Sequence, residues 1–518
     1  MKRDFAALTA THFDLLVCGG GIYGAWTAYD AALRGLKVAL VEQGDWAGAT
    51  SSASSKLIHG GLRYLESYDF KLVKKALTER GMLLETAPHR VWPLRFGVPV
   101  YAHSRIGRLQ LKAGLTLYDL LARIPDAGMR HRYFNRTKFA QRFSALAQNG
   151  LRGGFTYADA QTDDARLVLE LVAGAMAAGA ACVNHCELVA LNEMNGKVSG
   201  ATVQDRVSGG TRQVQARQVV NATGQWMTEA AVSRAWCRLS KGVHLILPKM
   251  LGEEALLLTA KSDGRVFFMI PWYGLTLVGT TDTDYRGDIE HVDVEKADVD
   301  YLLREVNHYL SSQWTERDVI GSYAGVRVMR QSDAASPSAV SRDWELKTTG
   351  NGVFYSVGGK LTSAREDAAV IVDAVCAELG VDVPCRTKGR AFPWTPDDFA
   401  AWSAAIVEQA HKLGIDAECS KWLMRRHGKR VSDILRDVEI NPSLAGRLVP
   451  ALPFIFADLL FCAREEMVVH LDDLLRRRMP LLILAKLTES ELGQIAQRAA
   501  GALGWGVARV KQEVLNIT

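Results

Sequence analysis

Apolar positions near the start of the chain alternate between strand-like runs and a helix-like repeat. DLLVC (residues 14–18) is a short apolar run, and AWTAYDAALRG (25–35) repeats apolar residues at helical spacing until a glycine ends it. KVALVE (37–42) is a second apolar run. This strand–helix–strand order predicts a parallel βαβ unit and therefore an α/β domain.

Other apolar runs continue the pattern. QVVNATGQW (218–226) and LSKGVHLILP (239–248) predict strands, and GVFYSVGGKLTSARED (352–367) predicts a strand that breaks at a glycine pair and restarts as a helix. LVAGAMAAGAACV (171–183) predicts a buried helix that passes into a strand. Since no run reaches about 18 uncharged apolar residues, we expect no transmembrane helix.

Two later segments are amphipathic or cationic. Residues 102–124 carry four cations among leucines at helical spacing, which is typical of a helix in an anionic lipid interface, or of one packed on its own domain. After residues 385–398 the pattern is helical to the end of the chain, and RRHGKR (425–430) predicts a solvated face or a contact with lipid or a partner chain. The cations of the first segment are Arg105, Arg108, Lys112 and Arg123.

Composition limits the functional classes. With 518 residues the chain predicts two or three domains, and 23% charged with 48% hydrophobic residues is typical of a globular protein. A net charge of +5 is too weak to indicate nucleic acid but suits anionic small molecules or lipid. Eight cysteines without a CxxC pair predict buried, reduced thiols in a cytoplasmic protein and no metal site, and MKRDFAALTATHFD is not a signal peptide.

The first βαβ unit carries a dinucleotide fingerprint. GGGIYG places Gly19, Gly21 and Gly24 at GxGxxG spacing between strand and helix, and Glu42 ends the second strand. The glycines permit a tight turn, close approach of a pyrophosphate, and close helix–strand packing, while the acid accepts from ribose hydroxyls. This arrangement predicts FAD or NAD rather than NADP.

The stretch GATSSASSKLIHGGLRYLES (48–67) follows directly and places five hydroxyl side chains within residues 50–55. A solvated linker would explain the serines but not the cations and large apolar residues among them. An extended flavin dinucleotide needs such donors at this place, so the order of motifs favours FAD.

Several motifs together identify a resemblance. GGGIYG, ATSSASSKLIHGGLRYLE, DDARLVL, NATG, IPW…GTTDTDY, AGVR, SRD and GGKLT have the order and spacing found in FAD-dependent, quinone-linked (aerobic) glycerol-3-phosphate dehydrogenases. The resemblance runs from Phe13 to EEMVVHLDDLLRRR (465–478). It implies a Rossmann-type FAD-binding domain like that of D-amino-acid and glycine oxidases, an antiparallel-sheet substrate domain, and an α-helical C-terminal cap domain. The FAD-binding and substrate domains are expected to interleave over residues 1–384, with the substrate parts at 95–155 and 236–325. The cap domain is expected at 385–518.

The same resemblance implies the reaction and its partners. A hydride passes from sn-glycerol 3-phosphate to flavin N5, giving dihydroxyacetone phosphate, and the electrons pass to a membrane quinone. The expected location is the cytoplasmic face of the inner membrane, with peripheral contact to anionic lipid, non-covalent FAD and no nucleic acid. The oligomeric state stays open, a homodimer being one alternative. An oxidase that uses oxygen is a further alternative, whereas a vestigial flavoprotein or an NAD enzyme fits the motifs less well.

Site residues follow from the matched motifs. Arg side chains suit a phosphate dianion because they fork around its oxygens, and a histidine can take the hydroxyl proton. The expected catalytic residues are His244, Arg63, Lys360 and Arg327, and the expected substrate ligands are Arg63, Tyr64, His244, Arg327, Arg342 and Thr281. The expected FAD ligands are Gly19, Gly21, Ile22, Tyr23, Gly24, Glu42, Gln43, Thr50, Ser51, Ser52, Ser55, Lys56, Leu57, Ala222, Thr223, Gly224, Gly359, Lys360, Leu361 and Thr362.

Three departures from the family motifs leave the identity of the substrate open. Val328-Met329 follows AGVR where the family usually has Pro-Leu, Val243 stands where serine is usual, and GGKLTSAR replaces GGKLTTYR. The two valines flank expected pocket residues. A longer polyol phosphate, such as a tetritol phosphate, is therefore an alternative substrate.

Overall fold

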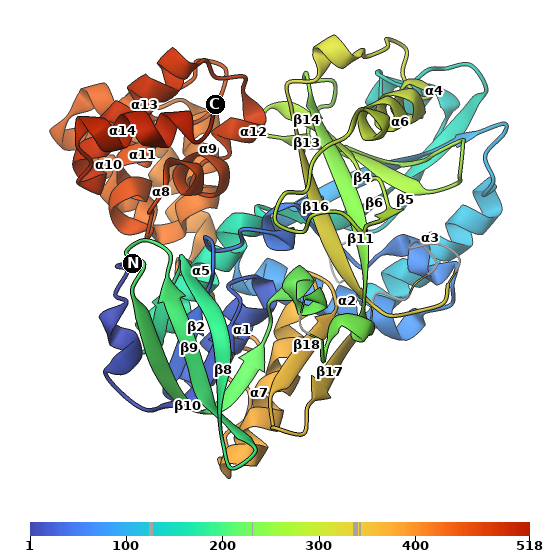
Figure 1. Cartoon of the computed structure of the whole chain (residues 1–518). Helices are drawn as coiled ribbons and strands as arrows, with labels where there is room; N and C mark the ends of the chain where they lie inside the picture. Colours follow the sequence, from blue (N-terminus) through green and yellow to red (C-terminus); the bar gives the residue numbers. More distant parts are fainter. Residues whose placement is uncertain (124–127, 230, 335–339, 341–342) are drawn as a thin grey trace.

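The computed structural model describes residues 1–123, 128–229, 231–334, 340 and 343–518. Figure 1 shows two sheets built from the earlier part of the chain and a separate group of helices formed by its last part. The expected α/β unit, antiparallel second sheet and helical C-terminal unit are therefore confirmed.

The first sheet is parallel at its centre. β1 (Phe13–Cys18) pairs in parallel with β10 (Thr211–Asn221) on one side and with β2 (Val38–Val41) on the other. The order β17-β18-β10-β1-β2-β7 is completed by β18 (Phe354–Gly358), β7 (Ala181–Val183) and an antiparallel edge strand, β17 (Trp344–Thr348). β8 (Cys186–Met194) and β9 (Lys197–Asp205) extend β10 as an antiparallel meander.

The strands of this sheet are apolar on both faces, so both faces are covered: helices pack on one, and the meander of β8, β9 and β10 packs on the other. α1 (Ile22–Leu33) packs between α5 (Asp164–Ala177) and α7 (Ala364–Leu379), and their apolar side chains form one buried cluster with alternate residues of β1 and β2. The sequence prediction of a buried helix entering a strand within 171–183 is confirmed by α5 and β7. The seven cysteines other than the half-buried Cys385 are buried, and all eight are free.

The second sheet is almost entirely antiparallel. Its order is β15-β11-β14-β13-β12-β4-β6-β3, with β16 added to β11 and β5 added to β6. The strands are β3 (Leu57–Ile58), β4 (Val91–Tyr101), β5 (Arg132–Asn135), β6 (Leu151–Thr162), β11 (Cys237–Leu247), β12 (Ala255–Thr259), β13 (Val266–Trp272), β14 (Leu275–Gly279), β15 (Thr283–Asp284) and β16 (Gly321–Arg330). Four helices accompany them, α2 (Phe70–Thr86), α3 (Arg108–Ala122), α4 (Arg136–Arg142) and α6 (Lys296–Asn307).

Alternation along β11 explains where its residues point. Val243, Leu245 and Leu247 belong to the cluster under α4 and α6, whereas Ile246 belongs to the cluster on the opposite face. Successive strand residues face opposite sides, so His244 lies on the side away from Val243.

The basic segment within 102–124 forms α3, which packs with one side only. Leu115 and Tyr118 are buried, whereas Leu109 and Leu120 are 81% and 73% exposed. Residue 124 lies outside the described residues. Among the described residues, no helix is long and apolar enough to cross a membrane.

The C-terminal unit consists of short helices, as the sequence predicted. They are α8 (Phe399–Lys412), α9 (Ala417–His427), α10 (Val431–Ile440), α11 (Phe456–Glu465), a π-helical turn (Asp473–Arg478), α12 (Leu481–Leu484), α13 (Glu489–Leu503) and α14 (Val507–Leu515). Figure 1 shows them gathered beside both sheets.

The expectation of a solvated face at residues 425–430 is wrong for two of its members. Arg426 and His427 are fully buried, and both contact the carboxylate of Asp458, at 2.5 and 2.7 Å. Buried charges are tolerated when they are paired in this way. The Arg426 guanidinium and the His427 imidazole thus share one carboxylate inside the C-terminal unit.

Candidate active site

A cavity of about 550 Å³ opens at the carboxyl ends of the parallel strands and faces the second sheet. Its wall includes the turns after β1 and β2, much of the stretch 48–64, and residues of β13, β16 and the turn after β18. Open α/β sheets bind ligands outside the carboxyl ends of their strands. The cavity therefore lies where the fold places a dinucleotide.

The glycine turn has the geometry that its spacing predicted. Gly19 adopts φ +109°, and a Cβ on Gly24 would lie 1.8 Å from the Gly19 carbonyl oxygen, so neither position accepts a side chain without strain. Gly19, Gly21 and Ile22 line the cavity. Gly24 acts behind them by letting α1 pack close to β1.

Glu42 ends β2 and folds back over the glycine turn. Its Oε2 accepts from Gly20 N at 2.5 Å and its Oε1 accepts from Gly44 N at 2.8 Å. Burial raises the pKa of this carboxyl, and the N–H groups of Gly44 and Gly20 act in the opposite direction. Glu42 and Gln43 both line the cavity, as expected of a ribose-binding position.

The serine-rich stretch divides between the cavity and the scaffold. Thr50, Ser51, Ser55 and Leu57 line the cavity, and the Ser51 hydroxyl accepts from Ile22 N at 2.9 Å. This part of the stretch lies against the start of α1, where a pyrophosphate would lie.

Lys56 and Ser52 take a different place from the cofactor contact that we expected. The Lys56 ammonium is buried, lies 2.6 Å from the carboxylate of Asp164, and donates to the Ser52 carbonyl oxygen at 2.6 Å. Asp164 is itself fully buried, so its charge requires a cation nearby. Lys56 therefore fixes the loop that presents the neighbouring hydroxyls.

Two further segments predicted to hold the cofactor meet the cavity. Ala222, Thr223 and Gly224 line it after β10. Gly359, Lys360, Leu361 and Thr362 line it after β18, just before α7.

Tyr23 ties the second of these segments to α1. Its hydroxyl accepts from Lys360 N at 3.0 Å and donates to Asp367 at 2.8 Å. A Cβ on Gly359, whose φ is +102°, would lie 1.8 Å from that hydroxyl oxygen. The turn can approach α1 this closely only with glycine at this position.

Arg327 projects from β16 into the cavity beside a loop of the second sheet. It donates to Thr280 Oγ1 at 2.7 Å and to the Thr281 carbonyl oxygen at 3.2 Å, and its Nη1 lies 3.5 Å from Asp282. A Cβ on Gly242 would lie 2.1 Å from the guanidinium. Thr281 is buried, and its hydroxyl accepts from Val243 N, so it supports β11 behind the wall.

Arg63, Tyr64 and Lys360 form a second cationic part of the cavity wall. The Lys360 ammonium lies 3.8 Å from the centre of the Tyr64 ring, and the Arg63 guanidinium lies 5.2 Å from it. All three residues line the cavity. The aromatic ring thus holds two cations that came from separate motifs.

His244 lies just behind the wall rather than on it. It is 1% exposed, its Nε2 lies 2.8 Å from the Ser55 hydroxyl, and its ring stacks on Tyr323 at 4.9 Å. Burial, followed by the charges of Arg327 and Lys56, lowers its pKa well below the usual value. The imidazole is therefore neutral at physiological pH and reaches the cavity through Ser55.

Sequence reasoning missed two residues of this site. Arg265 lines the cavity and donates to the Asp282 carbonyl oxygen at 2.5 Å, next to the partners of Arg327. His59 also lines the cavity, and burial, with the nearby cations, lowers its pKa to about 4. The position of His59 between Leu57 and Arg63 could have identified it, but no local signal marks Arg265.

Other expectations have mixed outcomes. Arg342 lies outside the described residues. Val328 lines the cavity, but Val243 is buried in the cluster under α6, so its side chain points away from the substrate end. Asp284, which follows the Thr281 loop, is exposed and pairs with Arg238 at 2.7 Å.

The cavity suits an extended flavin dinucleotide. A carboxylate stands at the ribose position, a glycine turn and a hydroxyl stand at the helix N-terminus, and backbone turns from Ala222 and Gly359 follow. Arg63, Arg265, Arg327 and Lys360 add cations to the same wall. The residues present therefore fit FAD with an anionic substrate at one end.

Comparison with known proteins agrees with this geometry. The family described as FAD dependent oxidoreductase matches residues 14–365, and the C-terminal domain of alpha-glycerophosphate oxidase matches residues 395–510. A protein of Synechocystis named glycerol-3-phosphate dehydrogenase is 36% identical over 530 residues, covering 97% of this chain and 95% of that protein.

Solved structures show the same relationship. The glycerol-3-phosphate dehydrogenase from Bacillus halodurans complexed with FAD superposes with a TM-score of 0.78 at 28% identity, covering 99% of this chain and 95% of that one. Glycine oxidase from Geobacillus kaustophilus superposes with a TM-score of 0.54 at 20% identity over 74% of this chain and 99% of that one. The second comparison bears on the fold alone.

Proposed function

Because this chain belongs to the glycerol-3-phosphate dehydrogenase family of FAD-dependent oxidoreductases, we propose that it oxidises the secondary alcohol of sn-glycerol 3-phosphate to dihydroxyacetone phosphate. FAD is its cofactor, and the proposal takes it to be bound non-covalently. The division of the chain goes with this proposal: FAD-binding and substrate parts interleave over 1–384, with substrate parts at 95–155 and 236–325, and the cap covers 385–518.

The observation that carries the proposal is the group of cations in the wall of the cavity. Among the described residues, Arg63, Arg265, Arg327 and Lys360 line the cavity. Arg265 donates to the Asp282 carbonyl oxygen, and Arg327 lies 3.5 Å from the Asp282 carboxylate. A phosphate dianion is the ligand that such a group favours, because guanidinium groups bind its oxygens in pairs.

The residues around the cofactor have distinct tasks. With FAD bound, Glu42 would accept from the ribose, the N-terminus of α1 and Ser51 would face the pyrophosphate, and the turn at Gly359 would contact the ring system. Bound FAD supplies the acceptor for the hydride that leaves C2 of the substrate. The ammonium of Lys360 stabilises negative charge that develops near this turn.

A proton must leave the substrate hydroxyl as the hydride departs. We assign its acceptance to His244, acting through the Ser55 hydroxyl, since the imidazole is neutral and hydrogen-bonded to that hydroxyl. His59 is the competing assignment, because it lines the cavity directly. Arg327 and Arg265 hold the phosphate, and Arg342 belongs to the same proposed set by its motif.

The proposed electron acceptor is a quinone, which requires contact with a membrane. The exposed side of α3 supports this part of the proposal, because it presents Leu109 and Leu120 together with Lys112 around a shallow hollow. Leucines next to cations suit the interface of an anionic lipid leaflet. The proposed location is the cytoplasmic face of the inner membrane.

An anaerobic titration tests the proposal. Addition of sn-glycerol 3-phosphate to the purified yellow protein should bleach the visible flavin band, and a soluble quinone should restore it faster than oxygen does. Glycerol at equal concentration is the control without phosphate, and erythritol 4-phosphate tests the longer alternative. A band that persists with glycerol 3-phosphate would refute the substrate assignment, and stoichiometric peroxide with no response to quinone would indicate an oxidase.

A further inference from the structure

The loop of residues 42–47, called here the ribose loop, closes directly on the glycine turn. Ala47 N donates to the Gly20 carbonyl oxygen at 3.0 Å, and Glu42 accepts from Gly20 N at 2.5 Å. A Cβ on Gly20 would lie 2.5 Å from the ring of Trp46. The position of the ribose loop therefore fixes both the ribose-binding carboxylate and the turn that faces the pyrophosphate.

The carboxylate of Asp45 anchors the ribose loop to the C-terminal unit. It is fully buried and accepts from Arg478 Nη2 at 2.8 Å, from Arg477 Nε at 2.6 Å and from Asn184 Nδ2 at 3.1 Å. Although burial raises the pKa of Asp45, the charges of Arg478 and Arg477 lower it below its usual range. The contact joins residues more than 430 positions apart.

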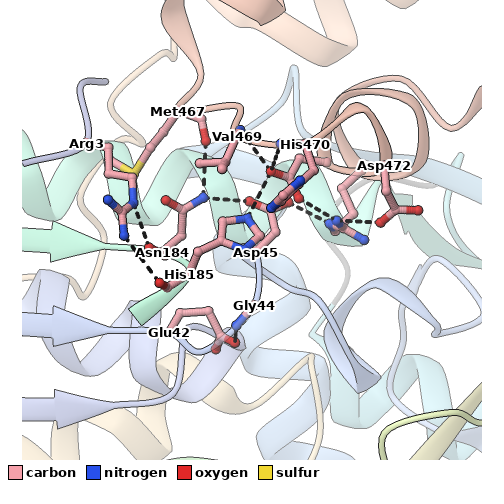
Figure 2. Close-up of polar contacts among 12 residues, drawn as sticks. Arg3, Glu42, Gly44, Asp45, Asn184, His185, Met467, Val469, His470 and Asp472 are labelled. Carbon is pink, nitrogen blue, oxygen red and sulfur yellow. Dashed lines mark hydrogen bonds and ion pairs between the residues drawn. The ribbon is translucent and has the colours of Figure 1, made fainter. Parts of the chain in front are cut away.

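The neighbouring turn, residues 183–188, is held from the same side, and Figure 2 shows its residues Asn184 and His185 beside Asp45. Its residues 186–188 line the cavity. Its backbone bonds the ribose loop through His185 N to the Gly44 carbonyl and through Cys186 N to the Glu42 carbonyl, each at 2.7 Å.

Side chains of this turn contact the C-terminal unit. His185 Nε2 lies 3.0 Å from Asp473, whose carboxylate also accepts from Val469 N and His470 N. Asn184 donates to the Met467 carbonyl oxygen at 3.1 Å. Residues 467–478 thus hold both the ribose loop and the adjacent turn.

An ion-pair network accounts for this cluster better than a metal does. Asp45, His185 and Asp473 bring their ligand atoms within 4.8 Å of one another. The guanidinium of Arg477 already bridges Asp45 and Asp473, at 2.6 and 2.9 Å. Arg477 and Arg478 together supply the positive charge that compensates these two carboxylates.

We propose that residues 467–478 of the C-terminal unit are positioning residues for the adenosine half of FAD, acting through Asp45 and His185. Within the described residues the cavity wall contains nothing beyond Thr362, so the effect is transmitted through the ribose loop and the turn. The proposal rests on FAD binding and not on the identity of the substrate. It gives the C-terminal unit a role in cofactor affinity.

Ligand fragments separate this role from general stability. In full-length apoprotein, Arg478→Met should weaken binding of FAD and of ADP at least tenfold, while FMN, which lacks the adenosine, should bind as it does to the wild type. Arg426→Met is the matched control, because this arginine is equally buried and ion-paired but contacts Asp458. Its affinities for FAD and ADP should be those of the wild type. Titration followed by intrinsic fluorescence, with circular dichroism to verify folding, measures all three ligands.

Two outcomes would refute the proposal. A folded Arg478→Met protein whose FAD and ADP affinities stay within twofold of the wild type refutes it, and so does a loss that affects FMN as much as ADP. If Arg478→Met does not fold, Asp45→Asn replaces it, because it keeps the side-chain volume and removes only the charge. Asp45→Asn should then weaken binding of FAD and of ADP at least tenfold, while FMN should bind as it does to the wild type. Because no substrate enters the titration, failure here is distinct from failure of the proposed reaction.

Discussion

The imidazole of His244 and the hydroxyl of Ser55 form one hydrogen-bonded unit across 2.8 Å, and only the serine meets the cavity. This relationship connects a strand of the second sheet with the stretch that follows the dinucleotide fingerprint. It converts a histidine in an apolar strand into a group that can exchange a proton with a ligand. Within the described residues, His244 Nδ1 has no hydrogen-bond partner.

The first prediction concerns this pair. Ser55→Ala and His244→Asn should each slow flavin reduction by roughly 10²–10⁴-fold, the usual effect of losing a general base, and the double variant should be no slower than the slower single one. Anaerobic stopped-flow measurement of the flavin band reports the rate. If His59→Asn alone produces the loss while both other variants react normally, the proton passes to His59 instead.

The second prediction concerns the phosphate. Arg327→Met and Arg265→Met should each raise KM for sn-glycerol 3-phosphate about 10–100-fold, since a hydrogen bond to a charged group contributes roughly 1.5–3 kcal/mol. Steady-state kinetics and a flavin absorbance spectrum show whether FAD stays bound. Arg238→Met is the control, because its ion pair with Asp284 lies outside the cavity wall. An unchanged KM for Arg265→Met would remove that residue from the site.

A third prediction tests whether the position of Arg327 matters and not only its charge. The added methyl group of Gly242→Ala would lie 2.1 Å from the guanidinium, so the side chain must move while every cation remains present. KM should rise several-fold with little change in thermal stability. Gly252→Ala is the matched control, because nothing lies within 4 Å of its Cβ position. A wild-type KM for Gly242→Ala would show that the guanidinium position is unimportant.

Local patterns predicted most of the fold, but not the contacts between distant segments. The glycine turn, Glu42 and the turn at Gly359 follow from short motifs whose geometry is set by neighbouring residues. Lys56 was expected to contact the cofactor, yet its partner is Asp164, 108 positions away. The sequence could not predict the place of Arg265 or the pairing of Asp45 with Arg478 for the same reason. Only tertiary packing brings these residues to their partners.

The fourth prediction concerns acid stability. Asp458 and Glu170 are buried, which by itself raises their pKa values, but adjacent Arg and His side chains lower both to about 2. Because the pKa of each carboxyl is lower in the folded than in the unfolded protein, the two ionised carboxylates stabilise the folded state above about pH 4.5. This stabilisation is lost as the pH falls towards 2 and the groups are protonated.

Urea unfolding between pH 6 and pH 3 measures this effect. Each carboxylate contributes about 2–3 kcal/mol to the acid dependence, so the midpoint should fall steeply below pH 4.5. Asp458→Asn should be less stable at pH 6 and flatter with pH, whereas the exposed Asp433→Asn should match the wild type. If Asp458→Asn left the pH dependence of the unfolding midpoint below pH 4.5 unchanged, Asp458 would not be a source of the acid dependence.

The fifth prediction concerns the exposed side of α3. Leu109 and Leu120 flank Lys112 on one side of a helix that buries Leu115 and Tyr118 on the other, so replacing the exposed leucines leaves the core intact. Burying a leucine side chain contributes roughly 1.5–3 kcal/mol. Leu109→Gln combined with Leu120→Gln should therefore lower binding to anionic vesicles at least tenfold in a sedimentation assay. The same double variant should turn over more slowly with a vesicle-embedded quinone, whereas its turnover with a soluble acceptor should be unchanged. Val507→Gln combined with Leu515→Gln removes two exposed apolar side chains from α14 and should change neither vesicle binding nor turnover. Equal vesicle binding by both double variants would place the membrane contact elsewhere.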